Sequence, residues 1–433
     1  MTNSAVGAAA ATAFDRHRLA RVTDGAAAAV AASLPWSTSA TGILVAIWFV
    51  ALLLTLDLAM LRREIMTPAG GAPLILVALA GLGMAWADVG LGQRLHGFEG
   101  YLKLLCIPFL LVQFRGSARG WWVIYGFFGA AAALLVVSFG LAWIPGLPWR
   151  GNMPGVPVKD YITQSGVFAL CVFALLGCAA EAWRERRRQL AWGLILVAAG
   201  FIADIAFVAT GRTALVTLAV LVPIFGYRQL GRKGVAAAGV LGCVLAGALW
   251  VSSPYLRHRI TQLGYEVEMY RAEHEVSSAG LRLDFWKSSI AAIAKAPIAG
   301  NGTGSIPEQL RSAIAPETGI ASFATVNPHN EILVVTIQLG LIGTVALLAM
   351  WTAHLLLFRG GGAVSWIGLV AVVQNMVGSL FNSHLSDFTQ GWIYVFAVGA
   401  LGGTALRQAA SRPTRSPSGG PLDSLPTTEI GCP

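Results

Sequence analysis

Charged residues are scarce in this sequence. Asp, Glu, Lys and Arg make up 12% of the 433 residues, whereas 56% are hydrophobic. This balance excludes an ordinary soluble domain and indicates a polytopic membrane protein. Metal motifs and basic patches with interleaved aromatic residues are also missing, which argues against a zinc site and against nucleic-acid binding.

Cysteine is equally rare, with five residues in the whole chain. Four of them, Cys106, Cys171, Cys178 and Cys243, lie in apolar runs, and Cys432 stands at the far end of the sequence. None falls in the one long polar segment between apolar runs, so the pattern does not predict a disulfide framework.

Long apolar runs dominate the rest of the chain, and each is long enough to cross a bilayer or nearly so. We count about twelve membrane spans, the first of which, 25–34, is alanine-rich and weak. The others lie at about 42–58, 71–88, 99–114, 120–143, 161–183, 189–208, 212–227, 234–252, 332–358, 363–382 and 388–407. The predicted fold class is therefore an all-α polytopic membrane protein.

The arginine and lysine residues predict the orientation of these spans. Clusters such as Arg62-Arg63, Arg184–Arg188 and Arg232-Lys233 fall on alternate connections between spans. Because cytoplasmic loops are rich in Lys and Arg, twelve spans place these clusters and both termini in the cytoplasm. The opposite, periplasmic side then carries one long segment. The predicted organisation is nine spans in 1–252, a large periplasmic loop in 253–328, three spans in 329–408 and a disordered cytoplasmic tail in 409–433.

The large loop has its own predicted helices. Leu256, Ile260, Leu263, Val267 and Tyr270 recur at spacings of four and three, as on one apolar stripe of a helix. A second helix is expected from about Leu281 to Lys295, ended by Pro297, and it places Arg282, Trp286, Ser289 and Ile293 on one face. A loop of this length in a compact protein is usually functional.

The segment Asn327–Leu333 at the exit of this loop carries the strongest chemical signal. Pro328 suits the first turn of a helix and Asn327 suits its N-cap, which would place His329 in the first turn. The helix dipole there disfavours an imidazolium, so we expect a neutral, basic His329 beside a site that attracts phosphate. An ordinary interfacial histidine is the alternative.

Arg212 stands on the predicted outer side, where positively charged residues are disfavoured and need a reason. It can bind phosphate with its planar, forked guanidinium, and it can compensate Asp204 in the preceding span; the two roles can hold at once. The acidic cluster Glu266, Glu268, Glu273 and Glu275 is expected to be a solvated face instead of a metal site, because residues two apart on a helix do not face each other. His384 and Asp387 on the last outer loop are candidates for orienting a substrate or His329, or they form an ordinary polar turn.

Three motifs in order carry a resemblance to a known family: Gly211-Arg212-Thr213, then Arg282 through Ala299-Gly300-Asn301-Gly302, then Pro328-His329-Asn330-Glu331 followed by Leu339-Gly340-Leu341-Ile342-Gly343. Together they resemble the O-antigen ligase and polymerase superfamily of bacterial envelope membrane proteins. The motifs cover about 195–360.

This resemblance implies a membrane glycosyltransferase of the bacterial inner membrane that needs no metal or other cofactor. It implies an O-antigen ligase that transfers glycan from undecaprenyl pyrophosphate to a sugar of the lipid A-core, at the periplasmic face and among membrane lipids. Arg212 and Arg282 would bind the donor pyrophosphate, His329 would activate the acceptor, and Asn330, His384 and Asp387 are candidates for supporting roles.

Three alternatives remain open at the level of the sequence. The polymerase and the protein O-oligosaccharyltransferase of the same superfamily differ from the ligase in their acceptor, for which the sequence shows no pocket. A transporter would need helices broken near the bilayer midplane and an internal repeat. Asp204 and Pro223 are the only hints of the first, and the sequence shows no repeat.

Overall fold

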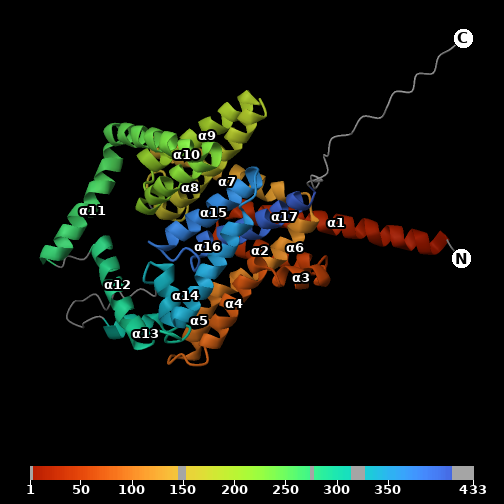
Figure 1. Cartoon of the computed structure of the whole chain (residues 1–433), viewed down its shortest axis with the longest axis horizontal. Coiled ribbons are helices and arrows are strands. Elements are labelled where there is room, and N and C mark those ends of the chain that lie inside the picture. The colour runs from red at the N-terminus through yellow and green to blue at the C-terminus, as the bar shows by residue number, and fades with distance from the viewer. Residues whose placement is uncertain (1–2, 145–152, 274–276, 314–326, 412–433) are drawn as a thin grey trace, which may run out of the picture.

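The computed structural model describes residues 3–144, 153–273, 277–313 and 327–411 (Figure 1). Within these ranges every regular element is a helix. The first half of the chain contains α1 (Asn3–Ser33), α2 (Thr38–Leu53), α3 (Leu58–Ile65), α4 (Pro68–Gly83), α5 (Leu91–Leu102), η1 (Lys103–Leu105), α6 (Cys106–Gly116), α7 (Gly120–Trp143), α8 (Tyr161–Arg184) and α9 (Arg188–Phe207). The second half contains α10 (Arg212–Ser252), α11 (Pro254–Glu273), α12 (Ser278–Lys295), α13 (Ile306–Ala313), α14 (Glu331–Leu357), α15 (Ala363–Ser379), α16 (Phe388–Phe396), η4 (Ala397–Leu401) and α17 (Gly402–Ala410).

Short polar side chains fix where several of these helices begin. Ser37 accepts a hydrogen bond from the backbone of α2, and Thr67 does the same for α4, whose first residue is Pro68. Asp160 accepts from two backbone amides of α8, those of Ile162 and Thr163. Such caps satisfy amides that have no partner inside the helix, so the sequence determines these starts locally.

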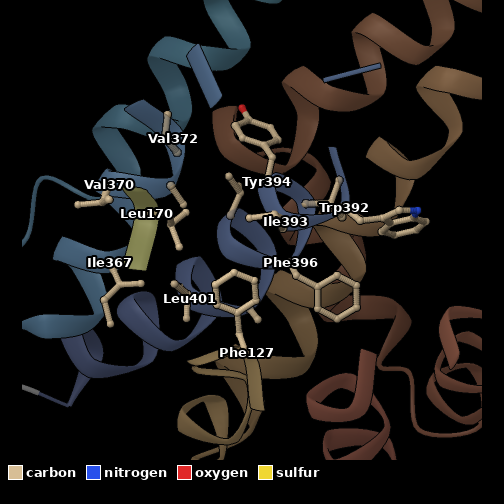
Figure 2. Close-up of a cluster of buried hydrophobic side chains, with 14 of the residues drawn as sticks. Phe127, Leu170, Ile367, Val370, Val372, Trp392, Ile393, Tyr394, Phe396 and Leu401 are labelled. Atoms are coloured by element: carbon tan, nitrogen blue, oxygen red, sulfur yellow. The ribbon is translucent and has the colours of Figure 1, made fainter. Parts of the chain in front are cut away.

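The core lies where α7, α8, α15 and α16 pack together. Figure 2 shows Phe127, Leu170, Ile367 and Phe396 converging from these four helices. α8 is the most deeply enclosed of the long apolar helices, since 78% of its most apolar stretch is buried. It is therefore the central helix of the bundle, and neighbouring helices pack around it.

α10 is two helices joined at Gly231, whose φ of +63° and ψ of −148° are not helical. The two halves fold back on each other, since a Cβ on Gly226 would lie 2.2 Å from the carbonyl oxygen of Gly234 and a Cβ on Gly242 would lie 3.3 Å from the side chain of Val222. The predicted pair of segments, 212–227 and 234–252, corresponds to these halves.

α14 is also broken, at Gly340, where φ is +61° and ψ is −157°. The hydroxyls of Thr336 and Thr344 lie 2.7 Å apart although a straight helix would separate them by about 12 Å, so the chain turns back at this glycine. The predicted span 332–358 therefore contains a break that the sequence analysis did not predict. Apolar residues continue on both sides of Gly340, so the sequence pattern does not predict the break.

The glycine-rich segment 300–304 fills this break. The backbone amides of Asn301 and Gly302 donate to the carbonyl oxygens of Ile337 and Gln338 at 2.8 and 2.9 Å, and the amide of Leu341 donates to that of Pro297 at 2.9 Å. Residues 300–304 and the preceding Pro297 thus satisfy the open carbonyls of the first half-helix and an open amide of the second.

Six helices are long and apolar enough to cross a membrane, or seven if α2 and α3, bent by 115°, count as one, among the residues described. These helices indicate a multi-pass membrane protein. Two of the six are the broken helices α10 and α14, and α4 and α15 are apolar but shorter. The count of about twelve spans, the division into domains and the periplasmic side of the large loop stay predictions.

The two ends of the chain differ from the sequence-based boundaries. The predicted weak span 25–34 is the end of the much longer α1, which is not among the six apolar helices. α17 continues to Ala410, two residues into the predicted tail, and 412–433 lie outside the described residues. In Figure 1, α1 extends from one end of the molecule and α11, α12 and α13 lie at the opposite end.

Candidate functional site

His329 precedes α14 instead of lying in its first turn. Its φ of +55° is left-handed, a conformation that a residue inside a right-handed helix does not adopt. The helix begins at Glu331, and Asn330 is the N-cap, its side-chain oxygen accepting from the amides of Ile332 and Leu333 at 2.9 and 3.2 Å. The predicted N-cap at Asn327 is therefore wrong, because the stronger cap stands three residues later.

Asn327 has a different role, which is to hold the turn that carries His329. Its side-chain oxygen accepts the backbone N–H of His329 at 2.8 Å and also the hydroxyl of Ser383. A left-handed backbone costs about 1–2 kcal/mol for a residue other than glycine. His329 keeps this conformation because its neighbours on both sides in the sequence fix it.

Asn382 joins His329 to Arg282 of α12. Its side chain hydrogen-bonds His329, and its Oδ1 lies 3.5 Å from a terminal nitrogen of Arg282. The rings of Phe285 and His329 are 6.4 Å apart, so α12 also packs against the histidine. The structure therefore brings together two of the three residues that the motifs singled out, through a third residue that they did not include.

Burial lowers the pKa of His329, the positive charge of Arg282 lowers it further, and the hydrogen bond with Asn382 opposes the shift. A lowered pKa leaves the imidazole neutral and able to accept a proton near pH 7. The expected neutrality thus rests on burial and on Arg282, since the histidine lies outside the helix whose dipole was expected to provide it.

Arg212 is paired with Glu266 of α11, not with Asp204. Its two terminal nitrogens lie 2.7 and 3.2 Å from the two carboxylate oxygens of Glu266. Asp204 is buried elsewhere and is bonded to Ser138 and Gln164. Two sequence-based predictions, one for Glu266 and one for Asp204, are corrected here. Glu266 is not part of a solvated face, since only 9% of it is exposed, and Asp204 does not compensate Arg212.

A cavity of about 370 Å³ lies between α8, α10, α11 and α12. Its lining contains three arginines, one glutamate and two tyrosines, and the full set is Tyr161, Ile162, Arg212, Thr213, Arg259, Gln262, Tyr265, Glu266, Met269, Ser277 and Arg282. Arg212 and Arg282 therefore face one volume, as the motif reading expects. The excess of guanidinium groups makes this cavity suited to an anion with several oxygens.

Arg259 is the cavity residue that the sequence analysis missed. Its guanidinium lies 4.9 Å from the centre of the Tyr161 ring, and one of its nitrogens is 3.4 Å from the side-chain oxygen of Gln262. The rule that drew attention to Arg212, a positive residue on the predicted outer side, applies equally to Arg259 and could have found it.

The loop that carries Asn382 is anchored by Glu331, the first residue of α14. Its buried carboxylate accepts the backbone amides of Leu385 and Ser386 at 3.1 and 3.0 Å and the Ser386 hydroxyl at 2.7 Å. Lys103 donates from the other side to the carbonyl oxygens of Ser386 and Asp387. This double anchorage fixes Asn382 relative to His329.

The three supporting candidates have structural positions. Asn330 caps α14 and also donates to the carbonyl oxygen of Leu380 at 3.1 Å. Asp387 caps α16 by accepting the amide of Gln390 at 2.8 Å. His384 is 5% exposed, and burial lowers its pKa to about 4. Within the described ranges neither His384 nor Asp387 hydrogen-bonds His329, so their predicted roles in orienting it stay predictions.

Comparison with known proteins adds the family. A protein-family model described as O-antigen ligase matches residues 197–348. The match supports the O-antigen ligase superfamily. No curated protein matches the chain at a significant level.

The matched segment contains every cavity arginine, Glu266 and His329, whereas the lining residues Tyr161 and Ile162 lie before it. Asn382 lies beyond the segment, although it bonds two of its residues. No group of three or more His, Cys, Asp and Glu side chains suited to a metal occurs among the residues that the structure describes. Metal independence itself stays a prediction.

Proposed function

We propose that this protein is an O-antigen ligase of the bacterial inner membrane. It transfers a glycan from undecaprenyl pyrophosphate to a sugar hydroxyl of the lipid A-core at the periplasmic face. The single observation that supports this best is the three-arginine cavity near a half-buried histidine that has a lowered pKa and is held in a left-handed turn.

The cavity supports the donor half of the reaction. When the bond between the anomeric carbon and the diphosphate breaks, negative charge develops on the leaving phosphoryl oxygens. Arg282, Arg259 and Arg212 present guanidinium groups to one volume, where fixed positive charge stabilises that leaving group without reorganisation. Arg–phosphate hydrogen bonds are among the strong, charge-assisted ones, and their forked geometry orients the diphosphate.

His329 supports the acceptor half. The acceptor hydroxyl oxygen forms the new bond to the anomeric carbon, and its proton passes to the neutral imidazole as general base. The glycan leaves undecaprenyl pyrophosphate, which keeps both phosphoryl groups. Arg282 connects the donor and acceptor sides of the reaction, because it lines the cavity and is linked to His329 through Asn382.

A strain that lacks the protein tests the reaction. We expect its lipopolysaccharide to lose the long ladder while free polyprenyl-linked polymer accumulates. Single repeats kept on the lipid A-core would instead identify a polymerase, and an unchanged ladder with loss of glycosylated protein would identify a protein oligosaccharyltransferase.

Complementation with variants connects this phenotype to the cavity. Arg282→Ala should fail to restore the ladder. Arg311→Ala is the matched control, because Arg311 lies on α13 in an exposed ion pair with Glu308 at 3.5 Å. Exposed pairs of this kind contribute about 0–1 kcal/mol, so this variant should restore the ladder fully.

A further inference from the structure

The guanidinium nitrogens of Arg212 already have hydrogen-bond partners in this structure. Its Nε donates to the carbonyl oxygen of Arg259 at 3.2 Å, and both of its terminal nitrogens bind the carboxylate of Glu266. A phosphoryl group that binds Arg212 in the same bidentate manner must therefore take the place of that carboxylate, because the two groups need the same donors.

Glu266 is held firmly as an anion. The hydrogen bonds from Arg212 lower its pKa below the usual value, so it is ionised at neutral pH. One of its oxygens also accepts the backbone N–H of Ala279 at 3.2 Å. Ala279 stands in the first turn of α12, where the free amides and the helix dipole favour a negative charge.

The other two cavity arginines differ from Arg212. Among the described residues, neither Arg259 nor Arg282 is bonded to a carboxylate, and the side-chain contacts of their terminal nitrogens are the amide oxygens of Gln262 at 3.4 Å and Asn382 at 3.5 Å. The cavity therefore offers an anion two arginines without a competing carboxylate and one that is already occupied.

We propose that Glu266 is an internal competitor for the donor diphosphate and thereby sets the affinity of the O-antigen ligase for it. This inference rests on the proposed function. The diphosphate meets Arg259 and Arg282 first, one phosphoryl group then replaces the Glu266 carboxylate on Arg212, and the carboxylate keeps its bond to the α12 amide. No covalent bond changes in this exchange.

Competition from Glu266 also affects product release at the end of the catalytic cycle. The product, undecaprenyl pyrophosphate, keeps the same two phosphoryl groups as the donor, so three unopposed arginines would hold it tightly and slow its release. Because Glu266 returns to Arg212, it favours departure of the product. Binding energy is then used for the leaving group during transfer without being retained after it.

The test is the affinity of the purified full-length protein in lipid nanodiscs for undecaprenyl pyrophosphate, with inorganic pyrophosphate as a second probe. Glu266→Gln keeps the shape of the side chain and removes its charge. We expect both probes to bind about tenfold more tightly, the change that corresponds to about 1.4 kcal/mol. Turnover should fall in the same variant, because product release becomes slower.

Glu268→Gln is the matched control, since Glu268 is exposed on the same helix and should leave both affinities unchanged. Unchanged or weaker binding in Glu266→Gln overturns the inference, because an acid that merely positions Arg212 would weaken the donor site when it is neutralised. Should that variant fail to fold, Glu266→Asp decides in the same way, since the shorter acid reaches the fork poorly and should also tighten binding.

The two proposals fail differently. If the wild-type protein binds undecaprenyl pyrophosphate and Glu266→Gln does not bind it more tightly, only the competitor is refuted. If neither protein binds the lipid, the donor site of the proposed function is refuted as well.

Discussion

The acid limb of the pH–rate profile should report His329. The general base works only as neutral imidazole, and burial together with Arg282 lowers its pKa from the usual value of about 6.5. At pH 7.5 a histidine with a pKa of 6.5 is about 90% neutral, and a lower pKa increases that fraction. Activity should therefore be flat near pH 7.5 and should fall about tenfold per pH unit once the pH drops below a pKa that is itself below 6.5.

Asn382 allows the sign of this effect to be tested. Its hydrogen bond raises the pKa of His329 against the other two influences, so Asn382→Ala should move the acid limb to lower pH. Asn382→Asp places a negative charge beside the imidazole and should move the limb to higher pH. The two phosphoryl groups of a glycosylated diphosphate stay ionised throughout this range, so the donor does not contribute to the limb.

The assay is transfer of labelled glycan from the lipid-linked donor to purified lipid A-core, measured as kcat/KM between pH 5 and 8. In His329→Ala the rate should fall by about 10²–10⁴ and the limb should disappear, while donor binding stays largely intact. A limb that persists in His329→Ala, or that moves in the same direction in both Asn382 variants, would refute the assignment of His329 as base. Loss of donor binding in His329→Ala would make it a phosphate ligand instead.

Four further outcomes are expected. Arg212→Lys keeps the charge and loses the planar fork, so donor binding should stay impaired in a binding assay, and wild-type affinity would contradict the bidentate grip. Gly340→Ala should lower the thermal midpoint of unfolding in detergent, because a left-handed backbone costs about 1–2 kcal/mol and the added Cβ would lie 2.2 Å from a backbone oxygen. Gly247→Ala is the control and should leave the midpoint unchanged, because a Cβ at that position meets nothing within 4 Å. Reporter fusions at Arg186 and Ser277 should lie in opposite compartments, and finding them on the same side would refute the topology. Transfer should persist in a strong chelator, and its loss with recovery on adding magnesium would reveal a metal site.

The sequence predicted the arginines of the cavity better than it predicted their partners. Arg212 and Arg282 were found because a charge in an apolar setting needs a reason, and both line the same cavity. Glu266 was misread because the spacing rule compares side chains on one helix, whereas its partner Arg212 comes from another helix 54 residues earlier. Contacts between distant elements have no local signature, so Asn382 was missed for the same reason.

Helix boundaries show where local rules hold and where they fail. The sequence predicted a span at 120–143, and α7 is Gly120–Trp143. The agreement is close because polar connections at both ends of a long apolar run set the limits of the helix. At His329 two caps competed, and Asn330 prevailed over Asn327 since it bonds two amides of the helix and one carbonyl oxygen beyond it. At Gly340 the apolar composition is continuous, so the break is visible only in the structure, in the backbone angles of Gly340 and in the bonds to 297–302.

Motif residues that do not line the arginine cavity explain how His329 is held in place. The segment 297–302 binds both half-helices at the Gly340 break, so it fixes the short helix that begins at Glu331. That helix in turn fixes His329 at its entrance and, through the Glu331 carboxylate, the loop with Asn382. A strained turn remains in one conformation only if its surroundings determine it fully. The glycines at a distance from the chemistry are therefore part of what places the imidazole beside Arg282, and changing them should alter the rate of transfer before it alters the charge of the cavity.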